Sequence, residues 1–197
     1  MDGLKADTFL NKESMRIKNK QESLNFMKRE KLNHFGEECF EKNDFTGVTN
    51  FLNKYPIKYY FLHELLPASP NVFYNLSRNE VLEKCRLYDK FGLDVSSTNY
   101  YHNRILCGEI ILDEKGTLLF SGSTNKDSTH RNFKEPNYFI KSTIFDKKLK
   151  FIPTLDKMID YIFEHNLFNL IIEFCTFDIP VGIYNEKIII YEVRTNY

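Results

Sequence analysis

The C-terminal segment carries acidic and basic side chains that could act together on a phosphodiester. Asp178 comes just before a turn, and Glu192 and Arg194 lie two residues apart on the next expected strand. Side chains at positions i and i+2 of a strand point to the same face, so Glu192 and Arg194 should be neighbours. Carboxylates are ligands for Mg²⁺, and a nearby cation can steady a phosphate. The same two residues could equally form a structural ion pair at the end of a strand.

This order of residues resembles the nucleases of the PD-(D/E)xK type. In that family an Asp and an acid-x-Lys strand, joined by a hairpin and preceded by a helix, hold the metal. Here Asp178, Glu192 and Arg194 would take those positions, and Glu164 could be the acid of the preceding helix at 154–166. Arg194 replaces the family's Lys, and a guanidinium is effectively never deprotonated. The resemblance implies a nuclease dependent on Mg²⁺ or Mn²⁺, with Asp178, Glu192 and Arg194 as catalytic residues.

A polar loop at residues 121–134 is the second candidate site. It is rich in hydroxyl and amide side chains and contains Lys126, His130 and Arg131. Such a loop could bind a phosphate or a nucleotide through backbone amides and basic side chains, although it lacks a P-loop or dinucleotide-binding pattern. The alternative is a solvated connection between two strands.

Residues 97–104 form the third candidate site. Tyr100, Tyr101, His102 and Arg104 are the residue types that commonly anchor protein interfaces or stack on bases. Tyrosine and arginine at the start of a strand can also be ordinary residues at the rim of a sheet.

Composition limits the classes of function. The chain has 197 residues, with 27 basic and 27 acidic side chains and therefore no formal net charge. Nucleic-acid binding is not favoured by this balance, because affinity for nucleic acid comes largely from phosphate neutralisation. No segment approaches the length of a membrane span and the N-terminus lacks an apolar leader, so we expect a cytoplasmic protein without a membrane partner.

Cysteine and histidine spacing predicts no metal site. The four cysteines are far apart, form no C-x-x-C pair, and are expected to be buried thiols in a reducing compartment. The five histidines are scattered without a metal-binding spacing. We therefore expect no cofactor, unless the nuclease alternative brings Mg²⁺ or Mn²⁺.

Three helices are predicted by apolar residues at helical spacing. The first carries Leu24, Met27, Leu32, Phe35 and Cys39 and is interrupted or ends near Gly36. The second begins with a capping box at Ser77 and Glu80, and Gly92 is expected to follow its C-terminus. The third begins after Thr154 as its N-cap.

Five main strands follow from apolar and β-branched runs. They cover residues 104–112, 117–122, 138–145, 170–177 and 187–194, with a turn at Gly116 after the first. The predicted fold is α+β, with a mixed, mostly antiparallel sheet of five or six strands and a helix crossing between two strand groups. An α-helical N-terminal region, residues 1–70, is expected to pack on an α+β domain, residues 71–197.

These features favour a non-enzymatic protein. Balanced charge, many aromatic residues and no complete catalytic motif predict a cytoplasmic interaction or accessory protein, similar in size and charge to immunity or regulator proteins. Its partner would be another protein of unknown identity. The divalent-metal nuclease and the phosphate or nucleotide binder at 121–134 are the two alternatives.

Overall fold

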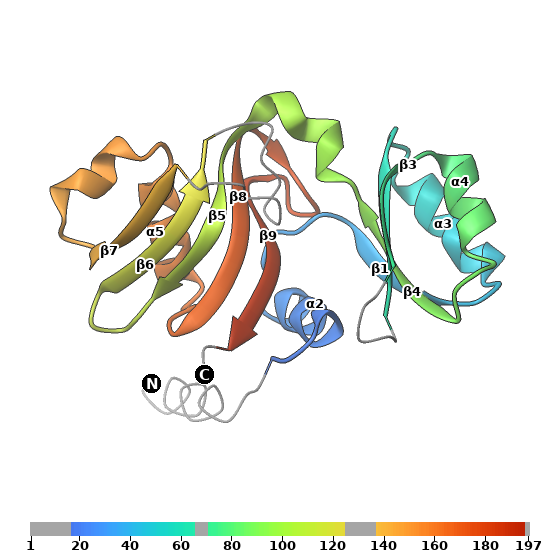
Figure 1. Cartoon of the computed structure of the whole chain (residues 1–197), viewed down its shortest axis with the longest axis horizontal. Coiled ribbons are helices and arrows are strands. Elements are labelled where there is room, and N and C mark those ends of the chain that lie inside the picture. Colours follow the sequence, from blue (N-terminus) through green and yellow to red (C-terminus); the bar gives the residue numbers. More distant parts are fainter. Residues whose placement is uncertain (1–16, 66–70, 125–136, 196–197) are drawn as a thin grey trace, which may run out of the picture. The chain divides into compact units, whose positions relative to one another are not determined.

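The computed structural model describes residues 17–65, 71–124 and 137–195, and the chain divides into two compact units. Among the described residues, unit 1 comprises 17–32, 105–124, 137–176 and 190–195, and unit 2 comprises 33–65, 71–104 and 177–189. Each unit has its own antiparallel sheet, so the predicted α+β class is confirmed (Figure 1). No helix in the described segments is long and apolar enough to cross a membrane.

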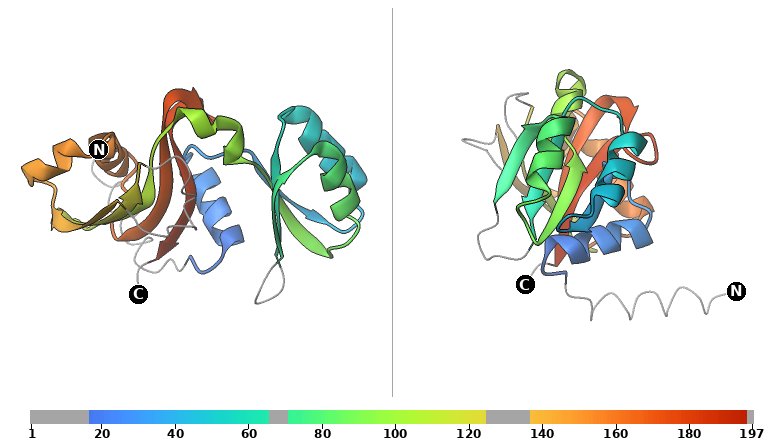
Figure 2. Two further views of the ribbon diagram at one scale, coloured as in Figure 1. Left: turned by 45° about the horizontal axis from the view of Figure 1, so that its top comes forward. Right: turned by 90° about the vertical axis from the view of Figure 1, so that its right-hand side faces the viewer.

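Unit 2 contains a four-stranded sheet with the order β1-β4-β2-β3. Its elements are β1 (Glu37–Glu41), α3 (Phe45–Lys54), β2 (Tyr60–Glu64), β3 (Val72–Leu76), α4 (Arg78–Lys84), β4 (Lys90–Val95) and the 3₁₀ segment η1 (Ser97–Asn103). Both α-helices lie on one face of this sheet (Figure 2). Phe40 faces α3, where its ring is 6.0 Å from that of Phe51, and Tyr60 donates to the Tyr55 carbonyl at 2.7 Å. Because side chains alternate along a strand, His63 and Asp94 point to the opposite face.

Unit 1 contains most of a five-stranded sheet with the order β7-β6-β5-β8-β9. Its elements are α2 (Lys20–Arg29), β5 (Arg104–Leu112), β6 (Thr117–Ser123), β7 (Tyr138–Thr143), the 3₁₀ segment η2 (Lys147–Phe151), α5 (Leu155–Glu164), β8 (Leu170–Val181) and β9 (Glu186–Thr195). Helix α2 is fastened to β9, because the Val193 amide donates to Ser23 Oγ at 2.7 Å and Lys20 Nζ donates to the Tyr191 carbonyl at 2.6 Å. The helix between two strand groups, predicted from sequence, is α5.

The core of unit 1 contains the apolar side chains of one face of α5 and of one face of β8. Leu155, Met158 and Ile162 of α5 are fully buried, as are Ile172 and Phe174 of β8. Two independent periodicities, one helical and one of strand type, therefore both place apolar side chains in the core of unit 1.

Two turns depend on glycines with positive φ. Gly116 has φ +82° in the β5–β6 hairpin, and Gly182 has φ +80° between β8 and β9. The buried Asn33 holds the second turn, since its Nδ2 donates to the carbonyls of Val181 and Ile188 at 2.9 and 2.8 Å. Its Oδ1 accepts from the Tyr184 amide at 2.9 Å, so one side chain fixes the turn in three places.

The N-terminal part of the chain differs from the prediction. Residues 1–16 lie outside the described structure, and α2 ends at Arg29 rather than near Gly36. Cys39, expected on that helix, lies in β1. The structure has two sheets, whereas a single sheet was predicted. The predicted division near residue 70 falls on residues 66–70, which are not described, and it stays a prediction.

Helix capping was predicted with mixed success. The capping box of Ser77 and Glu80 is present in α4. The helix ends at Lys84, however, and Gly92 lies inside β4, so the prediction of Gly92 as a helix terminator is wrong. Thr154 occupies the N-cap position of α5 but has φ 61° and makes no side-chain capping bond.

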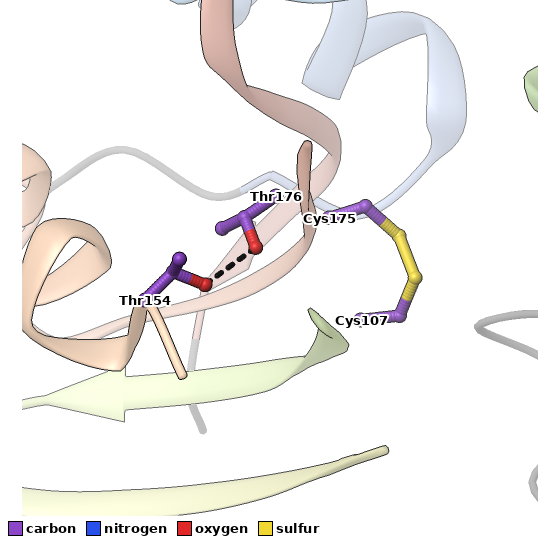
Figure 3. Close-up of a disulfide and its surroundings, with 4 residues drawn as sticks. All are labelled: Cys107, Thr154, Cys175 and Thr176. Atoms are coloured by element: carbon purple, nitrogen blue, oxygen red, sulfur yellow. Dashed lines mark hydrogen bonds between the residues drawn. A yellow bond between two sulfur atoms is a disulfide. The ribbon is translucent and has the colours of Figure 1, made fainter. Parts of the chain in front are cut away.

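A disulfide joins two neighbouring strands of unit 1. Cys107 of β5 and Cys175 of β8 have Cα atoms 4.2 Å apart and are bonded through sulfur (Figure 3). The prediction of four free thiols is therefore wrong, because the order β5-β8 brings together residues that are 68 positions apart. Next to the disulfide, Thr176 and Thr154 share a hydroxyl hydrogen bond of 2.6 Å that ties the start of α5 to β8.

Candidate functional site

Three glutamates from three adjacent strands surround one arginine in unit 1. Nη2 of Arg194 in β9 lies 2.6 Å from Glu109 Oε2 in β5 and 2.8 Å from Glu173 Oε1 in β8. Its Nε lies 3.9 Å from Glu192 Oε1, two residues earlier on β9. We call these four residues the glutamate–arginine cluster.

Strand order and alternation explain why these side chains meet. β5, β8 and β9 are consecutive in the sheet, so side chains on one face form a row across them. Residues next to the acids in sequence, such as Ile110, Ile172 and Val193, point the other way and are fully buried. The apolar face thus fixes the strand register, and the register places the charged side chains together.

The cluster carries excess negative charge. One guanidinium neutralises one of the three carboxylates, so two formal negative charges are left on these four side chains. Glu173 and Glu192 are only 12% and 13% exposed, whereas Glu109 and Arg194 are about 40% exposed, at 42% and 38%. Three oxygen-donor side chains with two surplus charges match what a divalent cation such as Mg²⁺ requires.

The C-terminal residues predicted from sequence do not all belong to this cluster. Glu192 and Arg194 are close, as their i and i+2 spacing predicted. Asp178 is an exposed residue in the part of β8 that belongs to unit 2, whereas the cluster belongs to unit 1. The α5 residue Glu164 is exposed as well.

The other predicted sites are only partly described. Lys126, His130 and Arg131 of loop 121–134 lie outside the described residues. Tyr100 stacks on Phe35 with ring centroids 5.3 Å apart. His102 is exposed, while Arg104 is 8% exposed with its guanidinium 5.9 Å from the ring of Tyr101. Contact of Tyr100, Tyr101, His102 and Arg104 with a partner protein stays a prediction.

Sequence reasoning missed Glu109 and Glu173. Each is a charged residue inside an otherwise apolar strand, in "LCGEIIL" and "LIIEFC". A carboxylate in such a run needs a compensating charge or ligand when the strand is central. That pattern was the available signal, but only the strand order shows that both acids meet Arg194.

Comparison with solved structures identifies the fold. The chain matches N5-carboxyaminoimidazole ribonucleotide synthetase, purK, solved as an ADP complex, with a TM-score of 0.52 and 12% identity over 92% of this chain and 46% of that one. D-alanine-D-alanine ligase from Coxiella burnetii matches with a TM-score of 0.48 and 12% identity, over 90% of this chain and 47% of that one. D-alanyl-alanine synthetase A from Vibrio cholerae matches with a TM-score of 0.49 and 9% identity, over 90% of this chain and 54% of that one.

The chain shares its fold with the matching part of purK. The chain spans about half the length of the structures it matches. No family model matches the sequence. A search of curated proteins finds no match either.

This fold overturns the functional predictions from sequence. The prediction of a non-enzymatic interaction or accessory protein is wrong, because the chain shares its fold with purK, which is a synthetase. The PD-(D/E)xK nuclease is wrong for the same reason: Glu192 and Arg194 belong to a sheet of a different fold. The phosphate or nucleotide binder placed its site on loop 121–134, whose residues 125–134 lie outside the described structure, so that placement stays a prediction. The acid-x-base spacing of Glu192 and Arg194 suggested a nuclease, but the same spacing occurs in strands of many folds.

Proposed function

We propose that this protein is an ATP-dependent enzyme that binds a purine nucleotide together with Mg²⁺ at the glutamate–arginine cluster. The fold supports a nucleotide, since the purK structure is an ADP complex. Fold alone is an argument by analogy, so the proposal depends on the site. The observation that carries it is the cluster's two surplus negative charges on Glu109, Glu173 and Glu192.

The residues present fit the metal that this function needs. Mg²⁺ prefers oxygen ligands and is commonly held by one or two carboxylates together with substrate phosphates. Glu173 and Glu192 would hold the ion, because they are the more buried acids, and Glu109 would complete the acidic set. The ion would supply charge neutralisation for the phosphates.

Arg194 gives the chain its own group for phosphate. A guanidinium donates several hydrogen bonds in a fixed planar arrangement, which suits phosphate as well as carboxylate. Its Nη2 is already shared between Glu109 and Glu173, at 2.6 and 2.8 Å. Its orientation is therefore set by two acids before any phosphate arrives, and it needs little ordering on binding.

Calorimetric titration with ADP, with and without MgCl₂, tests the proposal. We expect ADP to bind the wild-type protein more tightly with Mg²⁺. The double variant Glu173→Gln, Glu192→Gln should lose that dependence on Mg²⁺, whereas Glu164→Gln, which removes an exposed carboxylate of α5, should keep it. Absence of any ADP binding at millimolar concentration, or the same Mg²⁺ dependence in the double variant, would refute the proposal.

A further inference from the structure

A second group of metal-binding side chains lies in unit 2, on the sheet face opposite the helices. Glu37 comes from β1, His63 from β2 and Asp94 from β4. One potential ligand atom of each lies within 4.8 Å of those of the other two. None of these residues belongs to the glutamate–arginine cluster, and all three are in the same unit.

Strand register brings the three side chains together. Glu37 is paired directly with Asp94 across β1 and β4, and His63 is paired with Gly92 across β2 and β4. His63 Nδ1 lies 3.6 Å from Asp94 Oδ2, and its Nε2 lies 4.0 Å from Glu37 Oε1. Both distances exceed those of ordinary hydrogen bonds. One ion can bind only one nitrogen of the ring, and one ligand atom from each of the three residues lies within 4.8 Å of the other two. Binding a tetrahedral ion at about 2.1 Å would draw these atoms to about 3.4 Å from one another.

Gly92 makes room for the imidazole of His63. A Cβ atom at position 92 would lie 2.3 Å from Cε1 and 2.6 Å from Nε2 of that ring. The ring therefore rests against the backbone of β4, where any other residue would displace it. The absence of a side chain at Gly92 holds the imidazole between the two carboxylates.

Burial and charge favour a cation at this position. Glu37 and His63 are 6% and 8% exposed, and the Asp94 side chain is 14% exposed. Two carboxylates beside one imidazole carry a formal charge of two negatives when the ring is neutral. Carboxylate oxygens and an imidazole nitrogen are ordinary protein ligands of divalent cations. A divalent cation would neutralise both acids and could use one ring nitrogen as a ligand.

The donor set indicates which metal fits. One imidazole nitrogen with two carboxylate oxygens suits Zn²⁺ and related first-row ions better than Mg²⁺, which prefers an all-oxygen shell. Three protein ligands would leave a further coordination position open, as in zinc sites that bind water or a substrate atom. We propose that Glu37, His63 and Asp94 form a Zn²⁺-binding site in unit 2 with an open coordination position.

Zinc titration in excess MgCl₂ tests this site separately from the nucleotide site. Saturating Mg²⁺ occupies the all-oxygen cluster of unit 1, so Zn²⁺ binding at nitrogen remains visible. A Cys39→Ser background removes the partly exposed free thiol of β1, which would bind zinc by itself. Zinc content after dialysis and the absorption spectrum of the Co²⁺ form provide two readouts.

Four variants decide the outcome. His63→Gln and Asp94→Asn should each abolish the binding of one zinc ion per chain and remove the absorption spectrum of the Co²⁺ form. Gly92→Ala should weaken zinc at least about tenfold, although all three ligands are kept, because it displaces the ring. Glu38→Gln is the matched control, since Glu38 is the next residue of β1 and pairs with Lys54 instead.

Folding is checked by far-ultraviolet circular dichroism, and a variant that fails to fold is replaced by Glu37→Gln. One zinc per chain, lost in the ligand variants and kept in Glu38→Gln, supports the site. Wild-type protein that binds no zinc, or zinc binding unaffected by His63→Gln and Gly92→Ala, would overturn it. Because ADP binding is measured without zinc, failure here leaves the proposed nucleotide function standing.

Discussion

Replacing Arg194 by Gln should destabilise unit 1 by an amount that Mg²⁺ restores. Glu109 Oε2 and Glu173 Oε1 both contact Nη2 of Arg194, at 2.6 and 2.8 Å, so the two oxygens can be no more than 5.4 Å apart, the sum of those distances. At an effective dielectric constant of about 20, two unit charges at that distance repel by about 3 kcal/mol. Glu109 is 42% exposed, so solvent screening should reduce the loss to about 1–2 kcal/mol.

The Mg²⁺ dependence separates this explanation from simple loss of an ion pair. Without the guanidinium the cluster loses one positive charge beside its three carboxylates, so Mg²⁺ should stabilise Arg194→Gln more than it stabilises the wild type. Urea unfolding in low salt, repeated with MgCl₂ and with NaCl of equal ionic strength, distinguishes binding from screening. The free energy of unfolding of Arg194→Lys should lie between those of the wild type and Arg194→Gln.

A matched arginine provides the control for this experiment. Arg29 pairs with the carboxylate of Glu30 at 3.0 Å, and its side chain is 58% exposed. Arg29→Gln should change the free energy of unfolding by less than about 1 kcal/mol, with no specific response to Mg²⁺. Equal losses in Arg29→Gln and Arg194→Gln, or an equal Mg²⁺ response in wild type and Arg194→Gln, would refute the reasoning.

Three further predictions concern packing, a turn and the free thiols. Ile172→Ala should cost about 2–4 kcal/mol in urea unfolding because Ile172 is 0% exposed, whereas Ile179→Ala, at 40% exposure, should cost less than about 1 kcal/mol. Asn33→Ala should cost about 2–4 kcal/mol and speed proteolysis of the β8–β9 turn, since it leaves two buried carbonyls without their donor. Cys39 should react with iodoacetamide well before Cys85, because burial raises the pKa of the Cys85 thiol; equal rates by mass spectrometry would contradict this.

Sequence reasoning worked where the signal was local. The β5–β6 hairpin follows from Gly116, whose φ of +82° the turn requires. The capping box at Ser77 and Glu80 was correct because it depends on residues three positions apart. Helix α5 and strand β8 were correct because each carries its own periodicity, and the buried Ile172 lies where the strand pattern placed it.

The second sheet escaped prediction because its strands are short and their pattern is ambiguous. β1 and β2 have five residues each, and Cys39 of β1 continues the spacing of Leu24 and Met27 in α2 by coincidence. Periodicity alone assigns such a residue to the helix. Only pairing with β4, at Cys39 opposite Gly92, fixes it as a strand residue.

The two clusters of charged side chains could not be predicted from the sequence for a related reason. Glu37, His63 and Asp94 belong to three separate strands, and Glu109, Glu173 and Arg194 to three others. Within each strand no short motif marks the acid or histidine that joins a cluster. Strand pairing then brings charged residues of neighbouring strands together on the face opposite the apolar residues. Each sheet therefore buries an apolar face while the same register gathers carboxylates on the other. The two clusters differ in chemistry because one row includes Arg194 and the other includes His63 beside Gly92.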